Sequence, residues 1–159
     1  MFEHCTGRAR RCIFFARESA SHYGSESIET EHLLLGILHE DPDVIGRFLP
    51  SKTPMEIRAE IESRIAKCTA STRIEIPLSF LCKVILAYSA EEAERLHHRH
   101  INVDHLLIGV VREEDGTAGQ ILRSAGLNVI NMREQMLSDE TATEYDHRAS
   151  ALNPSTVNP

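Results

Sequence analysis

The sequence predicts an all-α protein in which two tandem four-helix repeats form one pseudo-two-fold domain of eight helices. Two observations predict this fold. The chain repeats itself at a fixed spacing, and within each copy apolar residues recur three and four positions apart, as they do in helices. With 159 residues, 42% of them hydrophobic, the chain is long enough to bury a core. Because tryptophan is absent and only 5% of residues are aromatic, that core must be mainly aliphatic.

The repeat is clearest in one segment of twelve residues. Residues 30–41 read TEHLLLGILHED, and residues 103–114 read VDHLLIGVVREE, an offset of 73. Five of the twelve pairs are identical and five more keep the charge sign or the aliphatic character, which chance does not easily produce without a gap. The same offset relates Phe15 to Tyr88, so the duplication extends beyond this segment.

Four helices are expected in the first copy. The first begins after Thr6, a good N-cap residue, and stops near Gly24. The second covers about 30–40 and is apolar on nearly every side, so it should be the central helix. A short third helix covers about 43–49, and a fourth starts at Thr53-Pro54-Met55-Glu56, which combines a capping box with proline at the first helical position.

The second copy is expected to repeat this arrangement, with helices at about Ser79–Leu96, Val103–Arg112, Thr117–Ala125 and Asn128–Leu137. The central helices of both copies contain a glycine, Gly36 and Gly109 respectively. Glycine costs about 1 kcal/mol relative to alanine inside a helix. We therefore expect another helix to approach closely at each of the two glycines.

The helical domain is expected to occupy residues 1–137, with repeat one at 1–68, a linker at 69–77 and repeat two at 78–137. The polar segment 138–159 is expected to be a mostly disordered tail, with one additional helical turn around residues 142–151.

Charge and composition exclude several classes of function. The net charge of −7 argues against general nucleic-acid binding. Four arginines near the start spread around a helix, so we interpret them as a solvated face: Arg8, Arg10, Arg11 and Arg17. No apolar run is long enough to span a membrane. The four cysteines form no C-x-x-C pair and the N-terminal residues lack a secretory pattern, so we expect free thiols and a cytoplasmic location.

Catalytic and metal motifs are also lacking. There is no G-x-x-x-x-G-K-[ST] loop for a nucleotide, and no base motif accompanies a cysteine. Four histidines lie close together in the sequence without the spacing of a zinc site: His97, His98, His100 and His105. The sequence therefore predicts neither an enzyme nor a bound metal or cofactor. His32 and His105, which match at the repeat offset, are expected to hydrogen-bond a neighbouring helix or loop.

Glu31 and Asp104 are the main candidates for function. Each is an acid in the first turn of a central helix, where it can simply complement the helix dipole. Alternatively, a carboxylate beside a helix N-terminus can accept a guanidinium while nearby backbone N–H groups hold an anion. A ligand that fits this second interpretation contains both a guanidinium and a phosphate. The residues alone leave both interpretations open.

The motif at residues 30–36, T-E-H-L-L-L-G, preceded by Phe2, Thr6 and Ala9 at characteristic spacing, resembles the Clp repeat. Two tandem copies, over about residues 2–137, are similar to the N-terminal domain of ClpC- and ClpA-type unfoldases. The resemblance implies a non-catalytic, all-helical module that recruits substrates and adaptor proteins to an AAA+ ring.

In ClpC-like proteins this domain binds proteins marked by arginine phosphorylation. By motif, the resemblance implies that Glu31 works with Thr6 in the first copy and Asp104 with Ser79 in the second. The second copy departs from the family pattern because its acid is one methylene shorter and Phe80 stands where a basic residue is usual. We therefore expect the first site to be the stronger one.

Two other functions stay open. The chain carries no ATPase motifs, so we expect a freestanding Clp-repeat protein rather than a fragment of an unfoldase. Such a protein could be a regulator or decoy that docks on a Clp unfoldase, and would then co-purify with Clp subunits even after Glu31 is replaced. It could also be a reused helical sensor domain, which a large apolar pocket between the two copies would favour.

Overall fold

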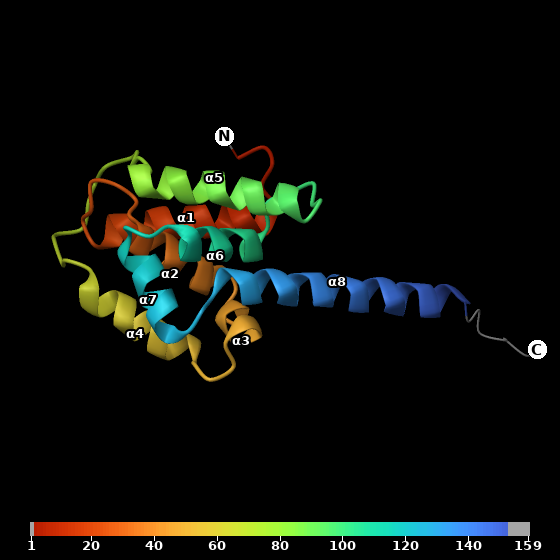
Figure 1. The fold of residues 1–159 in the computed structure, drawn as a ribbon. Helices are drawn as coiled ribbons and strands as arrows, with labels where there is room; N and C mark the ends of the chain where they lie inside the picture. The colour runs from red at the N-terminus through yellow and green to blue at the C-terminus, as the bar shows by residue number, and fades with distance from the viewer. Residues whose placement is uncertain (1, 153–159) are drawn as a thin grey trace, which may run out of the picture.

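The computed structural model describes residues 2–152, with side chains described for residues 2–141. Eight helices make up this part of the chain (Figure 1). The first copy contains α1 (Gly7–His22), α2 (Thr30–Glu40), α3 (Val44–Phe48) and α4 (Pro54–Arg64). The second copy contains α5 (Phe80–Arg95), α6 (Val103–Arg112), α7 (Thr117–Ala125) and α8 (Val129–Leu152). The all-α fold of two four-helix repeats is confirmed.

Local sequence signals set the ends of these helices. The Thr6 side chain caps α1 by accepting the backbone N–H of Ala9 at 3.1 Å. In α4, Thr53 and Glu56 form the capping box that the sequence predicts. Gly126 ends α7 in the left-handed conformation, with φ of 112°, which glycine adopts at little cost.

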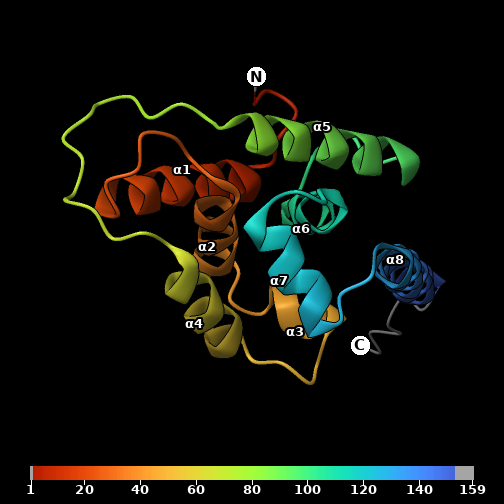
Figure 2. The ribbon, with the colours of Figure 1, turned by 60° about the vertical axis from the view of Figure 1, so that its left-hand side comes forward.

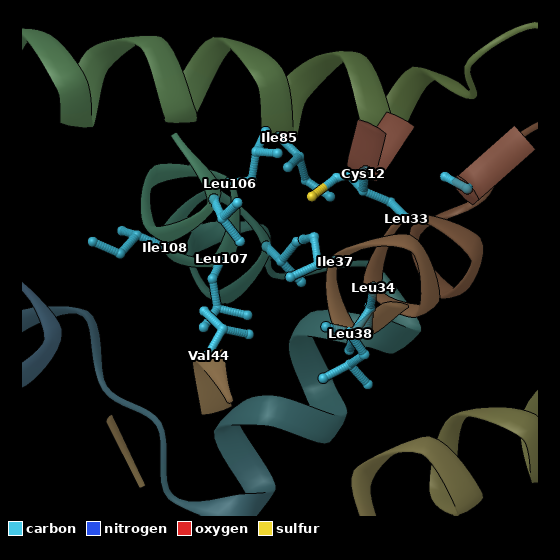
Figure 3. Close-up of a cluster of buried hydrophobic side chains, with 14 of the residues drawn as sticks. Cys12, Leu33, Leu34, Ile37, Leu38, Val44, Ile85, Leu106, Leu107 and Ile108 are labelled. Atoms are coloured by element: carbon cyan, nitrogen blue, oxygen red, sulfur yellow. The ribbon is translucent and has the colours of Figure 1, made fainter. Parts of the chain in front are cut away.

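The two central helices, α2 and α6, meet in the middle of the core. Figure 3 shows Ile37 of α2 beside Leu106 of α6, Leu107 of α6 pointing toward α3, and Ile85 of α5 lying over Leu106. These four side chains are completely buried. Each contributes about 1.5–3 kcal/mol of transfer free energy, so the contact between the copies is itself hydrophobic core.

A first helix packs directly on each central helix at its glycine. A Cβ atom added to Gly36 would lie 2.1 Å from the carbonyl oxygen of Cys12 in α1. One added to Gly109 would lie 2.7 Å from the carbonyl oxygen of Ile85 in α5. The close approach expected at these glycines is confirmed, and only glycine permits it.

The remaining contacts follow the pseudo-two-fold relation. α4 of the first copy packs on α7 of the second, and the equivalent pair, α8 and α3, also meets. Figure 2 shows α2 and α6 between α1 and α5 on one side and α4 and α7 on the other. The second copy therefore completes the core of the first, which makes the two repeats one folding unit.

The last helix, α8, is longer than its sequence predicts. α8 runs to Leu152, so the prediction of a mostly disordered segment from residue 138 is wrong as far as residue 152; residues 153–159 lie outside the described residues. Figure 1 shows the C-terminal half of α8 extending away from the other helices. Buried Met132 and Met136 anchor the first turns of α8. Once a helix is nucleated in this way, each further residue adds a hydrogen bond, and a polar sequence can continue it.

Candidate functional site

The first helix of each copy starts against the second helix of the other copy. The backbone N–H of Thr6 donates to the carbonyl of Ile101 at 2.9 Å, and that of Ser79 donates to the carbonyl of Ile28 at 3.0 Å. The two contacts are equivalent at the repeat offset of 73. Each links residues just before a first helix to residues just before a central helix.

This crossing decides which predicted site residues come together. Asp104 lies in the first turn of α6, and it lines one pocket with Thr6. Ser79 instead lies beside the start of α2, which carries Glu31. The pairing of Thr6 with Glu31 and of Ser79 with Asp104 is therefore wrong: each candidate site combines a hydroxyl from one copy with a carboxylate from the other.

The pocket that contains Asp104 has a volume of about 330 Å³. It is lined by Thr6, Gly7, Arg8, Arg11, Asp41, Arg47, Asn102, Val103 and Asp104. The hydroxyl oxygen of Thr6 accepts the capping bond from α1, which leaves its hydrogen available as a donor. The pocket thus joins a helix N-terminus, three guanidinium groups and two carboxylates.

Ion pairs order the charged side chains around this pocket. Arg47 of α3 contacts Asp104 at 2.6 Å and Asp41 at 2.9 Å. Burial opposes the positive charge of Arg47, but the hydrogen bond to Asp104 and the negative charges of Asp104 and Asp41 outweigh it and raise the pKa of Arg47. Arg11 binds Glu40 through two nitrogens, and these bonds lower the pKa of Glu40. These ion pairs hold Arg11 and Arg47 at the pocket wall.

The site that contains Glu31 has a different electrostatic character. Burial raises the pKa of the Cys82 thiol to about 12, and the negative charges of Glu29, Glu31 and Glu113 act in the same direction. Cys82 lies in the first turn of α5, so these three carboxylates add negative charge near this helix start. The next residue after the capping serine is Phe80, which is 77% exposed. This site suits a cation better than an anion.

The arginines of the Asp104 pocket carry no sequence signal of a binding site. Arg8 and Arg11 are more than half exposed, as expected for a solvated face, but each also pairs with an acid at the C-terminal end of α2. Arg47 belongs to none of the motifs recognised in the sequence. The repeat alignment offers one signal, because Arg47 aligns with the uncharged Gln120 and is therefore a charge present in one copy only.

The histidine that follows Asp104 fixes the turn that presents it. His105 is buried, and its Nδ1 accepts the backbone N–H of Asn102 at 3.0 Å. Its Nε2 therefore carries the proton and donates to Nδ1 of His98 at 2.7 Å. His32 accepts the backbone N–H of Glu29 in the same way. The expected bond to a neighbouring segment is confirmed for His105, whereas His32 bonds only the residue before its own helix and its buried Nε2 has no hydrogen-bond partner among the described residues.

Stability should depend on pH through His105. Burial, and then the nearby His98, lower the pKa of His105 to about 4. An unfolded histidine titrates near 6.5, so between about 6.5 and 4 the unfolded state binds more protons. We expect the free energy of unfolding to fall as the pH is lowered through this window, by up to about 1.4 kcal/mol per pH unit.

Urea denaturation at several pH values measures this dependence. The variant His105→Gln cannot titrate and should show a shallower fall between about pH 6.5 and 4. Replacing the exposed His100 by glutamine is the matched control and should leave the wild-type slope unchanged. The same slope in wild type and His105→Gln would contradict the assignment.

A second cavity lies between the copies. It is an open groove of about 720 Å³ between the N-terminal segment and α5. Apolar side chains form much of its wall, among them Phe2, Leu86, Ala90 and Ile101. Lys83 and Arg99 add positive charge.

Neither a metal cluster nor a membrane span is found in the described part of the chain. No three histidine, cysteine or acidic side chains there are placed to hold one ion. None of the helices within residues 2–152 combines the length and the apolar composition of a membrane span.

Comparison with known proteins places this geometry in context. The family profile of the Clp repeat N-terminal domain matches residues 4–125 and 78–154. The chain is 34% identical over 139 residues to the chloroplastic chaperone protein ClpC1 of rice, and 33% identical to a ClpA homologue of Guillardia theta. The match covers 86% of this chain but only 15% and 17% of these relatives.

Solved structures give the same result for the fold. The N-terminal domain of the chaperone ClpD from Arabidopsis thaliana superposes with a TM-score of 0.67 at 28% identity, covering 89% of this chain and 97% of that domain. The Hsp104 N-terminal domain of Candida albicans, 17% identical, also superposes with a TM-score of 0.67, covering 84% of this chain and 89% of that domain.

Proposed function

We propose that this chain, which belongs to the Clp N-terminal domain family, is a non-catalytic recognition module of the Clp chaperone and protease system. It binds protein substrates or adaptors and presents them to a Clp unfoldase. The relatives it matches are named as chaperones and as ATP-binding subunits of the Clp protease, and the chain spans about a sixth of their length. A cytoplasmic location stays a prediction, since several of these relatives are chloroplastic.

The Asp104 pocket is the proposed recognition site, and a phosphorylated arginine side chain is the proposed ligand. Asp104 would accept the ligand guanidinium. The phosphate would lie at the start of α1, near the Thr6 hydroxyl and Arg8. The single observation that supports this assignment most is that a carboxylate, a helix N-terminus and three arginines line one pocket.

The site at Glu31 and Ser79 is proposed as the weaker one. Its carboxylate can receive a guanidinium, but the neighbouring Glu29 and Glu113 would repel a phosphate. The sequence predicts that the site with Glu31 is the stronger one, and this proposal reverses that order. The reason is that the start of α1, with its arginines, lies in the same pocket as Asp104 and not beside Glu31.

Calorimetric titration with free phosphoarginine tests the proposal. We expect the wild type to bind, and Asp104→Ala to bind at least about tenfold more weakly, since a hydrogen bond to a charged group contributes about 1.5–3 kcal/mol. Glu31→Ala, the change at the equivalent position, is the matched control and should alter the affinity less than about threefold. No heat from the wild type at millimolar ligand would refute the modified-arginine proposal.

The groove along α5 supports a second candidate function. Its volume of about 720 Å³ lies within the range of small-molecule sites, and it lies between the two copies. If phosphoarginine does not bind, an apolar ligand or an apolar protein segment in this groove becomes the preferred explanation.

A further inference from the structure

The chain's own Arg47 occupies the carboxylate that a ligand would use. Its Nη2 lies 2.6 Å from Oδ1 of Asp104 and 2.9 Å from Oδ2 of Asp41. Arg47 belongs to the short helix α3 of the first copy, and Asp104 to α6 of the second. The side chain of Gln135 in α8 donates to the Arg47 carbonyl, which holds the backbone of Arg47 beside the pocket.

We infer that Arg47 is the specificity-determining residue of this pocket, an internal guanidinium that must be exchanged for that of the ligand. The inference rests on the proposed function. Arg47 contacts Oδ1 of Asp104, so an unmodified arginine could bind both oxygens of this carboxylate only by displacing Arg47. It would also bring a second positive charge without any new anion. Phosphoarginine carries its own anion, so Arg47 can leave Asp104 and bind the phosphate. The exchange keeps every charge paired, and the pocket therefore selects the phosphorylated side chain.

The surrounding residues permit this exchange. The Arg47 side chain is 39% exposed, so it lies at the pocket opening rather than in the core, and its two ion pairs are what keep it there. Asp41 is buried, but Arg8 also reaches its Oδ2 at 3.4 Å and stays beside it when Arg47 moves. When Arg47 moves away, Asp41 therefore keeps one of its two ion pairs, the longer one with Arg8.

The second copy lacks an equivalent guanidinium. Gln120 stands at the position that corresponds to Arg47 and has no charge. The Glu31 site should therefore accept arginine and phosphoarginine with less discrimination than the Asp104 pocket.

The ratio of two affinities tests the inference. Free phosphoarginine and free arginine are titrated by calorimetry into wild type, Arg47→Ala and Arg11→Ala. In wild type we expect phosphoarginine to bind at least about tenfold more tightly than arginine. In Arg47→Ala the ratio should fall to about threefold or less, because arginine gains access to Asp104 while phosphoarginine loses a phosphate contact. Arg11→Ala removes the same charge from the same pocket without touching Asp104, and arginine should bind it no better than wild type.

The outcomes separate the inference from the proposed function. An unchanged ratio in Arg47→Ala, with phosphoarginine still binding, would overturn the role of Arg47 and leave the recognition site intact. If wild type binds neither ligand, the proposed function fails. The titration of Arg47→Ala with arginine still decides whether Arg47 blocks Asp104. If arginine binds Arg47→Ala and this binding is lost in the double variant Arg47→Ala/Asp104→Asn, then Arg47 blocks the Asp104 carboxylate in the wild type. If arginine does not bind Arg47→Ala, the inference is rejected. Arg47→Gln, which copies the residue at position 120, repeats the test if the alanine variant does not fold.

Discussion

Replacing Glu92 with alanine is expected to lower the free energy of unfolding by about 3–5 kcal/mol, because it leaves two arginines without their shared counter-ion. Glu92 of α5 is fully buried and contacts Arg112 of α6 at 2.7 Å and Arg133 of α8 at 2.6 Å. The Arg112 and Arg133 side chains are only 20% and 27% exposed, so water replaces the lost carboxylate incompletely. The cluster joins three helices of the second copy and keeps α6, which carries Asp104, in position.

Glu91→Ala is the matched control for this prediction. Glu91 also contacts Arg112 at 2.7 Å, but its side chain is 57% exposed. An exposed pair contributes about 0–1 kcal/mol, so we expect a change in that range. Urea denaturation at neutral pH measures both variants, and similar values for the two would contradict the role assigned to burial.

The Glu92 cluster also has a defined pH dependence. Burial alone would raise the pKa of Glu92, but the ion pairs with Arg133 and Arg112 outweigh burial and lower it below 4.5. A carboxyl with a lowered pKa stabilises the folded state above its unfolded pKa and loses that contribution as the pH falls through the folded pKa. The cost of Glu92→Ala should therefore shrink below about pH 4.5.

The second large effect is expected for Gly36→Ala, which should destabilise the protein by about 3 kcal/mol. The added methyl group would lie 2.1 Å from the carbonyl oxygen of Cys12 and 2.7 Å from the backbone nitrogen of Ala16. Both atoms belong to the α1 backbone, so no side chain can turn away to make room. The two helices must separate, which opens the core.

Gly46→Ala tests whether the close approach, and not the helix, is responsible. Gly46 lies in α3, and an added Cβ atom meets nothing within 4 Å. Alanine favours a helix over glycine by about 1 kcal/mol, so this variant should be unchanged or slightly more stable. Thermal denaturation of the two variants gives the comparison, and equal destabilisation would rule out the packing explanation.

Local signals predict the helices well because each signal acts within a few residues. The capping box at Thr53 and the apolar run of α2 both lead to the helices that the structure contains. The continuation of α8 beyond Leu137 is missed because its later residues are polar. The composition of a segment indicates whether it can contribute to a hydrophobic core. A helix such as α8, whose first turns are already packed, can continue through polar residues without any further core contact.

The candidate site is harder to predict because it forms across the duplication. Motif spacing identifies Thr6 and Asp104 separately, but the family motif assigns each hydroxyl to the acid of its own copy. The contact between the Thr6 backbone and Ile101 exists only once the two copies have folded together. Arg47 is missed for the same reason, since its partner Asp104 is 57 positions away in the sequence.

A titration of ¹⁵N-labelled protein with phosphoarginine, followed by amide NMR, tests the central claim that the recognition site combines the two copies. We predict the largest shifts in the first turn of α1, at Gly7 and Arg8, together with those at the start of α6, around Asp104. The shifts of both groups of amides should saturate at the same ligand concentration, and the signals of the amides next to Glu31 should shift little in that range. Shifts that pair the start of α1 with the start of α2, and leave α6 unmoved, would contradict the claim.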